Sequence, residues 1–228
     1  MNEHILKRFD EELEKLSKRI RKMAALVEQQ VNDAVKALRE GDTGLAAQVI
    51  DGDDKVDLYD TKIEKHCMRL LALQQPVAVD LRTVLSALSV NRNLERMGDA
   101  AVNIAERIEV LAPHADLVTR TRVLEMGDVA AEMIRDTIEA FVDIDVARAR
   151  SVAIRDNIID EYDAQNFDVL IGLMKESPEN VEAASHLLIV SRNLERIADE
   201  ATNIAEEAVF VADAKIVKHK GFGKDSDA

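Results

Sequence analysis

Pairs of carboxylates at a fixed spacing are the residues of this sequence best suited to do chemistry. The segment RNLERMGDAAVNIAER (92–107) recurs as RNLERIADEATNIAEE (192–207). Many apolar side chains fill a core equally well, so a repeat of acidic and polar residues needs a separate explanation. Residues four apart share one face of a helix. Four carboxylate pairs have this spacing: Asp53 and Asp57, Glu95 and Asp99, Asp156 and Asp160, and Glu195 and Asp199.

Two prolines predict which pairs face each other. Pro76 is midway between the first two pairs, and Pro178 adjoins the midpoint between the last two. Because proline is tolerated in the first turn of a helix, each proline marks a turn between two antiparallel helices. Each hairpin would then bring one pair opposite another. Steps of seven residues from Glu95 lead back to Leu88 and Leu81, which predicts that the carboxylates point into the bundle.

Four carboxylates at one level of a bundle cannot all stay ionised unaided. Two like charges about 4 Å apart repel by roughly 4 kcal/mol at an effective dielectric constant near 20. Three outcomes are open: the carboxylates bind metal, pair with arginines, or become protonated. A donor set of oxygens alone suits iron, manganese or magnesium, with zinc as a further option. The arginines available for pairing are Arg92, Arg96, Arg192 and Arg196.

An internal repeat predicts the elements that position these pairs. The segment that begins at Met23 aligns with the one that begins at Met126, at an offset of 103 residues, and the acidic segments align at an offset of 100. The breaks in the pattern predict six helices, over 4–40, 43–74, 77–111, 117–142, 145–175 and 179–212. The predicted fold is all-α, with two tandem, sequence-related three-helix bundles over 1–112 and 113–214, and a disordered tail over 215–228.

Composition excludes several classes of function. The chain of 228 residues is 47% apolar but only 3% aromatic, which favours helices over many short strands. A net charge of −14 argues against nucleic acid as a direct partner, since phosphate binding needs a basic surface. Cys67 is the only cysteine, so there is no disulfide within the chain and no cysteine-based zinc site. A charged N-terminal segment and the lack of a long apolar run predict a cytoplasmic protein with no direct membrane insertion.

The sequence resembles the PhoU family, the accessory regulators of bacterial phosphate uptake. The resemblance is carried by RNLERMGD and RNLERIAD, by the four carboxylate pairs, and by the opening FDEELEKLSKRIRKMAALVEQQVNDAV. It implies two three-helix bundles whose carboxylate motifs hold multinuclear iron or zinc clusters on the bundle surface. The metal ligands implied are Asp53, Asp57, Glu95, Asp99, Asp156, Asp160, Glu195 and Asp199.

The resemblance also implies a function without catalysis. A PhoU-like protein links the phosphate ABC transporter, through its ATP-binding subunit, to the sensor histidine kinase of the phosphate regulon. It restrains the phosphate-starvation response when phosphate is plentiful, and a homodimer is expected. The two copies differ at Asp54 against Asn157 and at Glu64 against Phe167, which predicts that the two clusters differ.

Two other interpretations compete with a metal-binding regulator. One is a di-metal carboxylate enzyme, either an oxidase or a phosphatase, but the Glu-x-x-His motif of ferritin-like oxidases does not occur. The other is a helical scaffold whose acids form salt bridges with arginines. No glycine-rich phosphate loop is present either, and the five histidines show no ligand spacing with one another.

Overall fold

Helices make up nearly all of the chain that the structure describes. The computed structural model describes residues 2–214, and the predicted tail lies outside the described residues. Within 2–214 the chain forms no strand, so the predicted all-α fold is confirmed. The elements are α1 (Asn2–Glu40), α2 (Thr43–Gly52), α3 (Asp54–Gln74), α4 (Ala78–Ala105), α5 (Ile108–Leu111), the 3₁₀ turn η1 (Ala112–His114), α6 (Ala115–Thr119), α7 (Val123–Asp143), α8 (Val146–Glu176) and α9 (Asn180–Asp213).

The six predicted helices correspond to the long elements, with two differences. The helix expected over 43–74 is interrupted at Asp53, whose N–H donates to the carbonyl of Ile50 at 3.3 Å. A bond to the residue three positions back tightens the turn and separates α2 from α3. The helix expected over 77–111 ends as α4 at Ala105 and continues only as the single turn α5.

Matching caps begin the second helix of each repeat. Asp42 precedes α2 and accepts a hydrogen bond from the N–H of Leu45 at 2.9 Å. Asp145, which is 103 residues later, precedes α8 and accepts one from the N–H of Arg148 at 3.0 Å. Each side chain satisfies one of the unpaired N–H groups at a helix start. The repeat therefore preserves the polar residues that start a helix.

The first helix of each repeat ends in a left-handed residue. This residue is Gly41 after α1, with φ of +65°, and Ile144 after α7, with φ of +53°. Glycine adopts this conformation without a steric penalty, whereas the Cβ of isoleucine is crowded there. Because Ile144 is also 41% exposed, strain at this position is not offset by full burial of its side chain.

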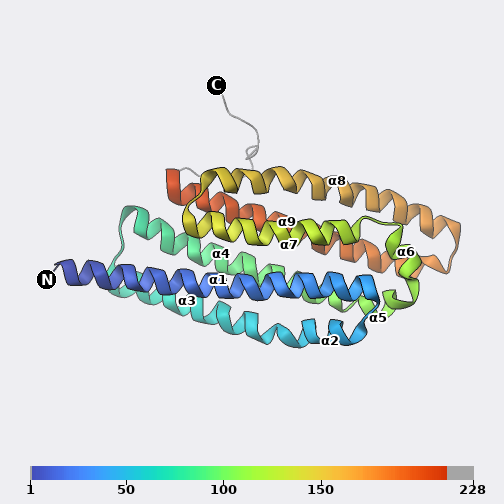
Figure 1. The fold of residues 1–228 in the computed structure, drawn as a ribbon, viewed down its shortest axis with the longest axis horizontal. Coiled ribbons are helices and arrows are strands. Elements are labelled where there is room, and N and C mark those ends of the chain that lie inside the picture. Colours follow the sequence, from blue (N-terminus) through green and yellow to red (C-terminus); the bar gives the residue numbers. More distant parts are fainter. Residues whose placement is uncertain (1, 215–228) are drawn as a thin grey trace, which may run out of the picture.

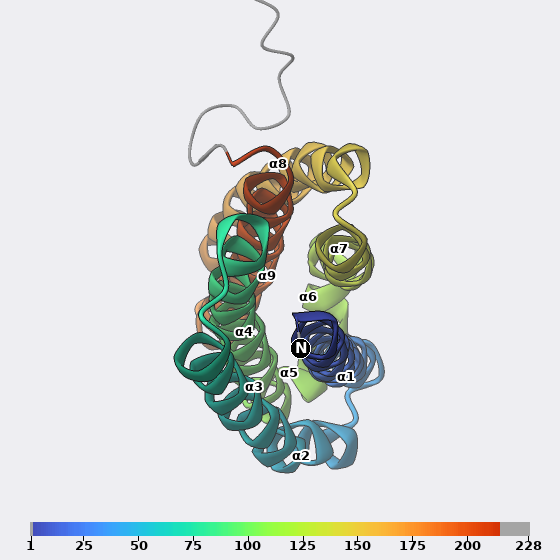
Figure 2. The same cartoon turned by 90° about the vertical axis from the view of Figure 1, so that its left-hand side faces the viewer.

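The two repeats pack side by side along their lengths. Figure 1 shows the long helices running along one axis, and Figure 2 shows α3, α4, α9 and α8 as one curved layer with α1 and α7 on its inner side. Met23 of α1 and Met126 of α7 are both fully buried, as the repeat predicts for core residues. A Cβ on Gly127 of α7 would lie 2.3 Å from Val35 of α1, so the glycine permits close approach of these two helices.

The central seam of the layer is formed by α4 and α9, which run antiparallel. Near one end, Arg82 donates to the carbonyl of Val211 at 3.0 Å. Further along, the Ser86 hydroxyl donates to Glu207 at 2.6 Å. The seam thus joins the two helices that carry the recurring acidic segment, and it contains polar groups as well as apolar ones.

Candidate functional site

The α3–α4 hairpin brings the first set of four carboxylates together. Asp53 stands at the start of α3 with Asp57 one turn later, and Glu95 and Asp99 lie in the second half of α4. Partial burial raises the pKa of Asp53, and the carboxylates of Asp57 and Asp99 raise it further. The hydrogen bond from Gln30 lowers this pKa but does not cancel the increase. Burial also raises the pKa of Glu95, with additional repulsion from Asp99, Asp60 and Asp57. These residues therefore form one electrostatic cluster, as the midpoint at Pro76 predicts.

The α8–α9 hairpin assembles the second set in the same way. Burial raises the pKa of Asp156 to about 7, and repulsion from Asp160, Asp199 and Glu195 adds to the effect. Burial also raises the pKa of Asp199, which Asp160 raises further. An acid with a pKa near 7 is neutral in part of the protein population at physiological pH. The positive groups around the second cluster therefore do not balance the negative charge of its four carboxylates.

The prediction that these carboxylates point into the bundle is wrong. Asp57, Asp99, Asp160 and Asp199 are exposed, and the other four acids are half-buried. The apolar positions used to trace the stripe lie at the surface themselves, because Leu81 is 36% exposed and its counterpart Val181 is 44% exposed. Steps of seven residues also drift around a straight helix by about 20° per step. The stripe follows the margin of the core, and the clusters are surface features.

Arginine pairing does not neutralise the clusters. Between residues 9 and 214, no ion pair within 4 Å reaches Asp53, Asp57, Glu95 or Asp99. In the second cluster Arg192 pairs with Asp163 at 3.0 Å and approaches Glu195 at 3.6 Å. Arg96 instead contacts Glu200 of the other repeat at 3.4 Å. The salt-bridged scaffold therefore has little support at the first cluster and partial support at the second.

The donor chemistry suits a cation, although the side chains are not arranged around one. Oxygen donors and uncompensated negative charge suit hard or borderline cations. In the part of the chain that the structure describes, no group of three or more His, Cys, Asp and Glu side chains has the geometry of a metal site. Binding would thus require rotamer changes, which the exposed acids can make without disturbing the core. A cavity of about 370 Å³ adjoins the first cluster and is lined by Asp60, Glu64, Leu88, Asn91, Arg92 and Glu95.

Gln30 supports the first cluster and was not among the predicted site residues. It is 7% exposed and donates from Nε2 to Oδ1 of Asp53 at 3.2 Å, while its Oε1 has no hydrogen-bond partner. A Cβ on Gly98 would lie 3.2 Å from Asp53 and 3.4 Å from Gln30. The repeat places Met133 and Ala198 at the matching positions of the second cluster. A comparison of the two repeats could therefore have identified Gln30, because the residue type changes at this position and at Gly98. The same two differences make the two clusters chemically different.

The sequence and the structure agree with one family of known proteins. The PhoU domain matches residues 20–108 and 123–208, one match in each repeat. The chain belongs to the PhoU family. It is 40% identical over 207 residues to the phosphate-specific transport system accessory protein PhoU homolog of Caulobacter vibrioides, with 90% of each chain covered. The corresponding protein of Aquifex aeolicus is 39% identical over 209 residues, which cover 92% of this chain and 95% of the relative.

Solved structures of PhoU proteins have the same fold. The crystal structure of PhoU from Pseudomonas aeruginosa superposes with a TM-score of 0.84 at 34% identity, covering 91% of this chain and all of that one. The phosphate transport system regulatory protein PhoU from Streptococcus pneumoniae gives a TM-score of 0.82 at 31% identity, covering 92% and 99% of the two chains. These relatives are named as accessory or regulatory proteins of phosphate transport. Among the described helices of the present chain, none is both long and apolar enough to cross a membrane.

Proposed function

We propose that this protein is a cytoplasmic, metal-binding negative regulator of the phosphate-starvation response. It would act without catalysis, by contact with the ATP-binding subunit of the phosphate ABC transporter and with the sensor histidine kinase of the phosphate regulon. The names of the PhoU relatives support the link to phosphate transport. The observation that carries the metal proposal is the duplicated grouping of uncompensated carboxylates on two hairpins.

The metal ligands proposed are the eight acids of the two clusters. They are Asp53, Asp57, Glu95 and Asp99 in the first cluster, and Asp156, Asp160, Glu195 and Asp199 in the second. Multinuclear iron or zinc clusters fit this proposal best, with manganese or magnesium as alternatives. A bound cation would supply positive charge that offsets the mutual repulsion of the acids. The chain itself contributes two rigid hairpins, and Gln30 orients Asp53 at the first.

Protein contacts suit the surface better than contacts with nucleic acid. The net charge of −14 disfavours binding to a phosphate backbone. Large apolar side chains are exposed on the two hairpins, including Leu58 at 52%, Leu73 at 69% and Phe167 at 54%. Exposed apolar groups beside charged ones are typical of protein–protein interaction sites. We propose that these surfaces serve docking to the transporter and kinase and assembly of a homodimer.

The regulatory proposal is tested in cells and with purified proteins. Deletion of the gene should raise expression of phosphate-starvation genes in phosphate-rich medium. The purified full chain should bind the transporter's ATP-binding subunit or the cytoplasmic part of the kinase. If it binds neither protein but shifts promoter DNA at physiological salt, a direct repressor replaces the adaptor.

The metal and the absence of catalysis require separate measurements. Elemental analysis of protein purified without a metal-affinity tag should find iron, zinc or manganese bound to the chain. Metal-loaded protein should show no steady dioxygen uptake and no steady hydrolysis of phosphate esters. Turnover by the wild-type protein that is lost in Asp99→Ala would contradict the regulator and favour a di-metal enzyme.

A further inference from the structure

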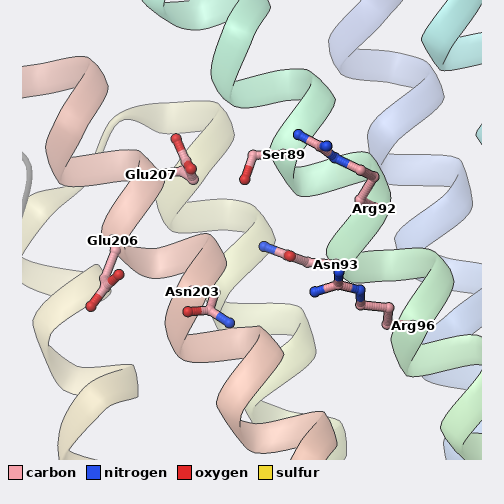
Figure 3. A pocket seen from close by; sticks show the side chains of 7 residues that line it. All are labelled: Ser89, Arg92, Asn93, Arg96, Asn203, Glu206 and Glu207. Carbon is pink, nitrogen blue, oxygen red and sulfur yellow. The ribbon is translucent and has the colours of Figure 1, made fainter. Parts of the chain in front are cut away.

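A cavity of about 220 Å³ lies in the seam between the two repeats. It is bordered by α4 and α9 and lined by Ser89, Arg92, Asn93, Arg96, Asn203, Glu206 and Glu207. Figure 3 shows Arg92 and Arg96 on α4 and Glu207 on α9, with Asn93 and Asn203 between the two helices, whereas the Glu206 side chain extends from the side of α9 that faces away from α4. The cavity is distinct from the four-carboxylate clusters, although Arg92 also lines the cavity beside the first one.

Asn93 is a buried donor with no partner. Its side chain is 6% exposed, and Nδ2 makes no hydrogen bond. A buried polar group left unsatisfied costs about 1–3 kcal/mol, so native proteins rarely retain one without a partner. In Figure 3 the Asn93 amide extends from α4 toward α9. Beside it, Arg92 is exposed, and between residues 9 and 214 it forms no ion pair within 4 Å.

The matching positions of the other repeat are satisfied internally. Asn193, the counterpart of Asn93, donates from Nδ2 to the carbonyl of Ile189 at 2.8 Å. Arg192, the counterpart of Arg92, pairs with Asp163 at 3.0 Å. Because the same two residue types have protein partners in one copy and not in the other, the unpartnered Asn93 amide and the unpaired Arg92 guanidinium are specific to this cavity and are not a general property of the repeated segment.

Sequence differences between the copies sharpen the contrast. Ser89 stands where the second repeat has Ile189, which adds a hydroxyl to the α4 wall. Glu207 stands where the first repeat has Arg107, and Arg107 pairs with its neighbour Glu106 at 3.0 Å. Compared with the surface formed by the matching residues of the other repeat, the cavity therefore has an additional hydroxyl on the α4 wall and an additional carboxylate on the α9 wall.

The two walls favour different charges. The α4 wall offers the Ser89 hydroxyl, the Asn93 amide N–H and the Arg92 guanidinium, which bind a carboxylate well. The α9 wall carries Glu207, whose charge opposes a free multivalent anion and attracts an ammonium group. A compact molecule with both charges satisfies both walls. We propose that this cavity binds a small zwitterion that carries a carboxylate and an ammonium group, of the class of free α-amino acids.

The probes are the common L-α-amino acids, each added singly to the metal-stripped full-length chain. Acetate, inorganic phosphate and methylammonium serve as probes with a single type of charge. At least one amino acid should raise the thermal midpoint and shift the Asn93 side-chain amide resonance in a ¹⁵N-correlated NMR spectrum. Failure of every amino acid overturns the proposal, as does binding of acetate or phosphate alone with equal affinity. This readout does not depend on metal or on the regulatory partners.

Matched variants locate the ligand. Asn93→Ser and Arg92→Met should each reduce affinity for the amino acid by about tenfold or more. Asn193→Ser and Arg192→Met, at the equivalent positions, should leave it unchanged. Arg92 is exposed, so its variant keeps the test informative even where Asn93→Ser unfolds the chain. Equal losses in both sets of variants would place the site elsewhere and overturn the assignment.

Discussion

Replacing Asp156 by asparagine should stabilise the metal-free protein at neutral and higher pH. In the fold, the pKa of this acid is raised to about 7 from an ordinary value of 3.8 by burial and by three neighbouring carboxylates. The folded state therefore binds the proton more tightly than the unfolded state does. Stability contributed by protonated Asp156 is present at low pH and is lost as pH rises from about 4 to about 7.

The size of the effect follows from the shift. One pKa unit corresponds to about 1.36 kcal/mol, so the full shift would amount to roughly 4 kcal/mol. Because Asp156 is only partly buried, solvent screening reduces this figure, and we expect about 1–2 kcal/mol. Asp156→Asn removes the ionised form and should raise the free energy of unfolding by that amount at about pH 8, with little change at about pH 4.

Urea unfolding followed by circular dichroism, with a chelator present, measures the difference. The control is Asp168→Asn, an exposed residue of α8 outside the cluster. The control should show no comparable dependence on pH. An Asp156→Asn effect of equal size at both pH values would refute the electrostatic reasoning, because only packing changes act independently of protonation.

Three further predictions address the clusters and the repeat. Glu95→Ala combined with Asp99→Ala should abolish metal at the first cluster and spare the second, since distant sites act independently; unchanged metal per chain by elemental analysis would contradict the assignment. Gln30→Met should weaken metal binding at the first cluster by about tenfold in equilibrium dialysis, because outer-shell partners tune affinity; the second cluster, which has Met133 at that position, is the internal control. Ile144→Gly should stabilise the fold by about 1 kcal/mol in thermal unfolding, because it relieves the left-handed strain. Gly41→Ala, at the matching position, should cost a similar amount, so a loss of stability in Ile144→Gly or a gain in Gly41→Ala would refute the argument.

The sequence predicts the hairpins and the grouping of acids because both depend on local rules. Helix periodicity and proline turns determine which residues of adjacent helices face each other. Pro76 therefore locates Asp57 opposite Glu95 without knowledge of the rest of the fold. The break at Asp53 was not predicted, because a single tightened turn leaves the pattern of apolar residues on either side unchanged.

Which side of a helix faces the core depends on tertiary packing. The acids follow an apolar stripe in the sequence, but Leu81 and Val181 of that stripe are exposed in the structure. In a chain with four long helices in one layer, each helix has apolar positions at the edge of the core as well as within it. Sequence periodicity alone does not separate these two classes. The surface location of the clusters therefore follows from the assembled layer.

The cavity in the seam depends on contacts between the repeats and could not be predicted from either repeat alone. Its walls meet because α4 and α9 run antiparallel, which brings Ser86 to Glu207 and Arg96 to Glu200. The first repeat has Ala100 where the second has Glu200, so the Arg96–Glu200 pair has no counterpart across the seam.

Departures from the repeat coincide with chemical differences in the structure. Gln30 against Met133 distinguishes the two carboxylate clusters, and Glu207 against Arg107 distinguishes the two sides of the seam. A duplicated unit needs the same apolar positions in each copy to build its core, so changes there are limited to other apolar residues of suitable volume. Polar residues at the surface and in the seam are free of that constraint. The fold therefore explains the similarity of the two copies, and their differences are where separate binding properties can arise.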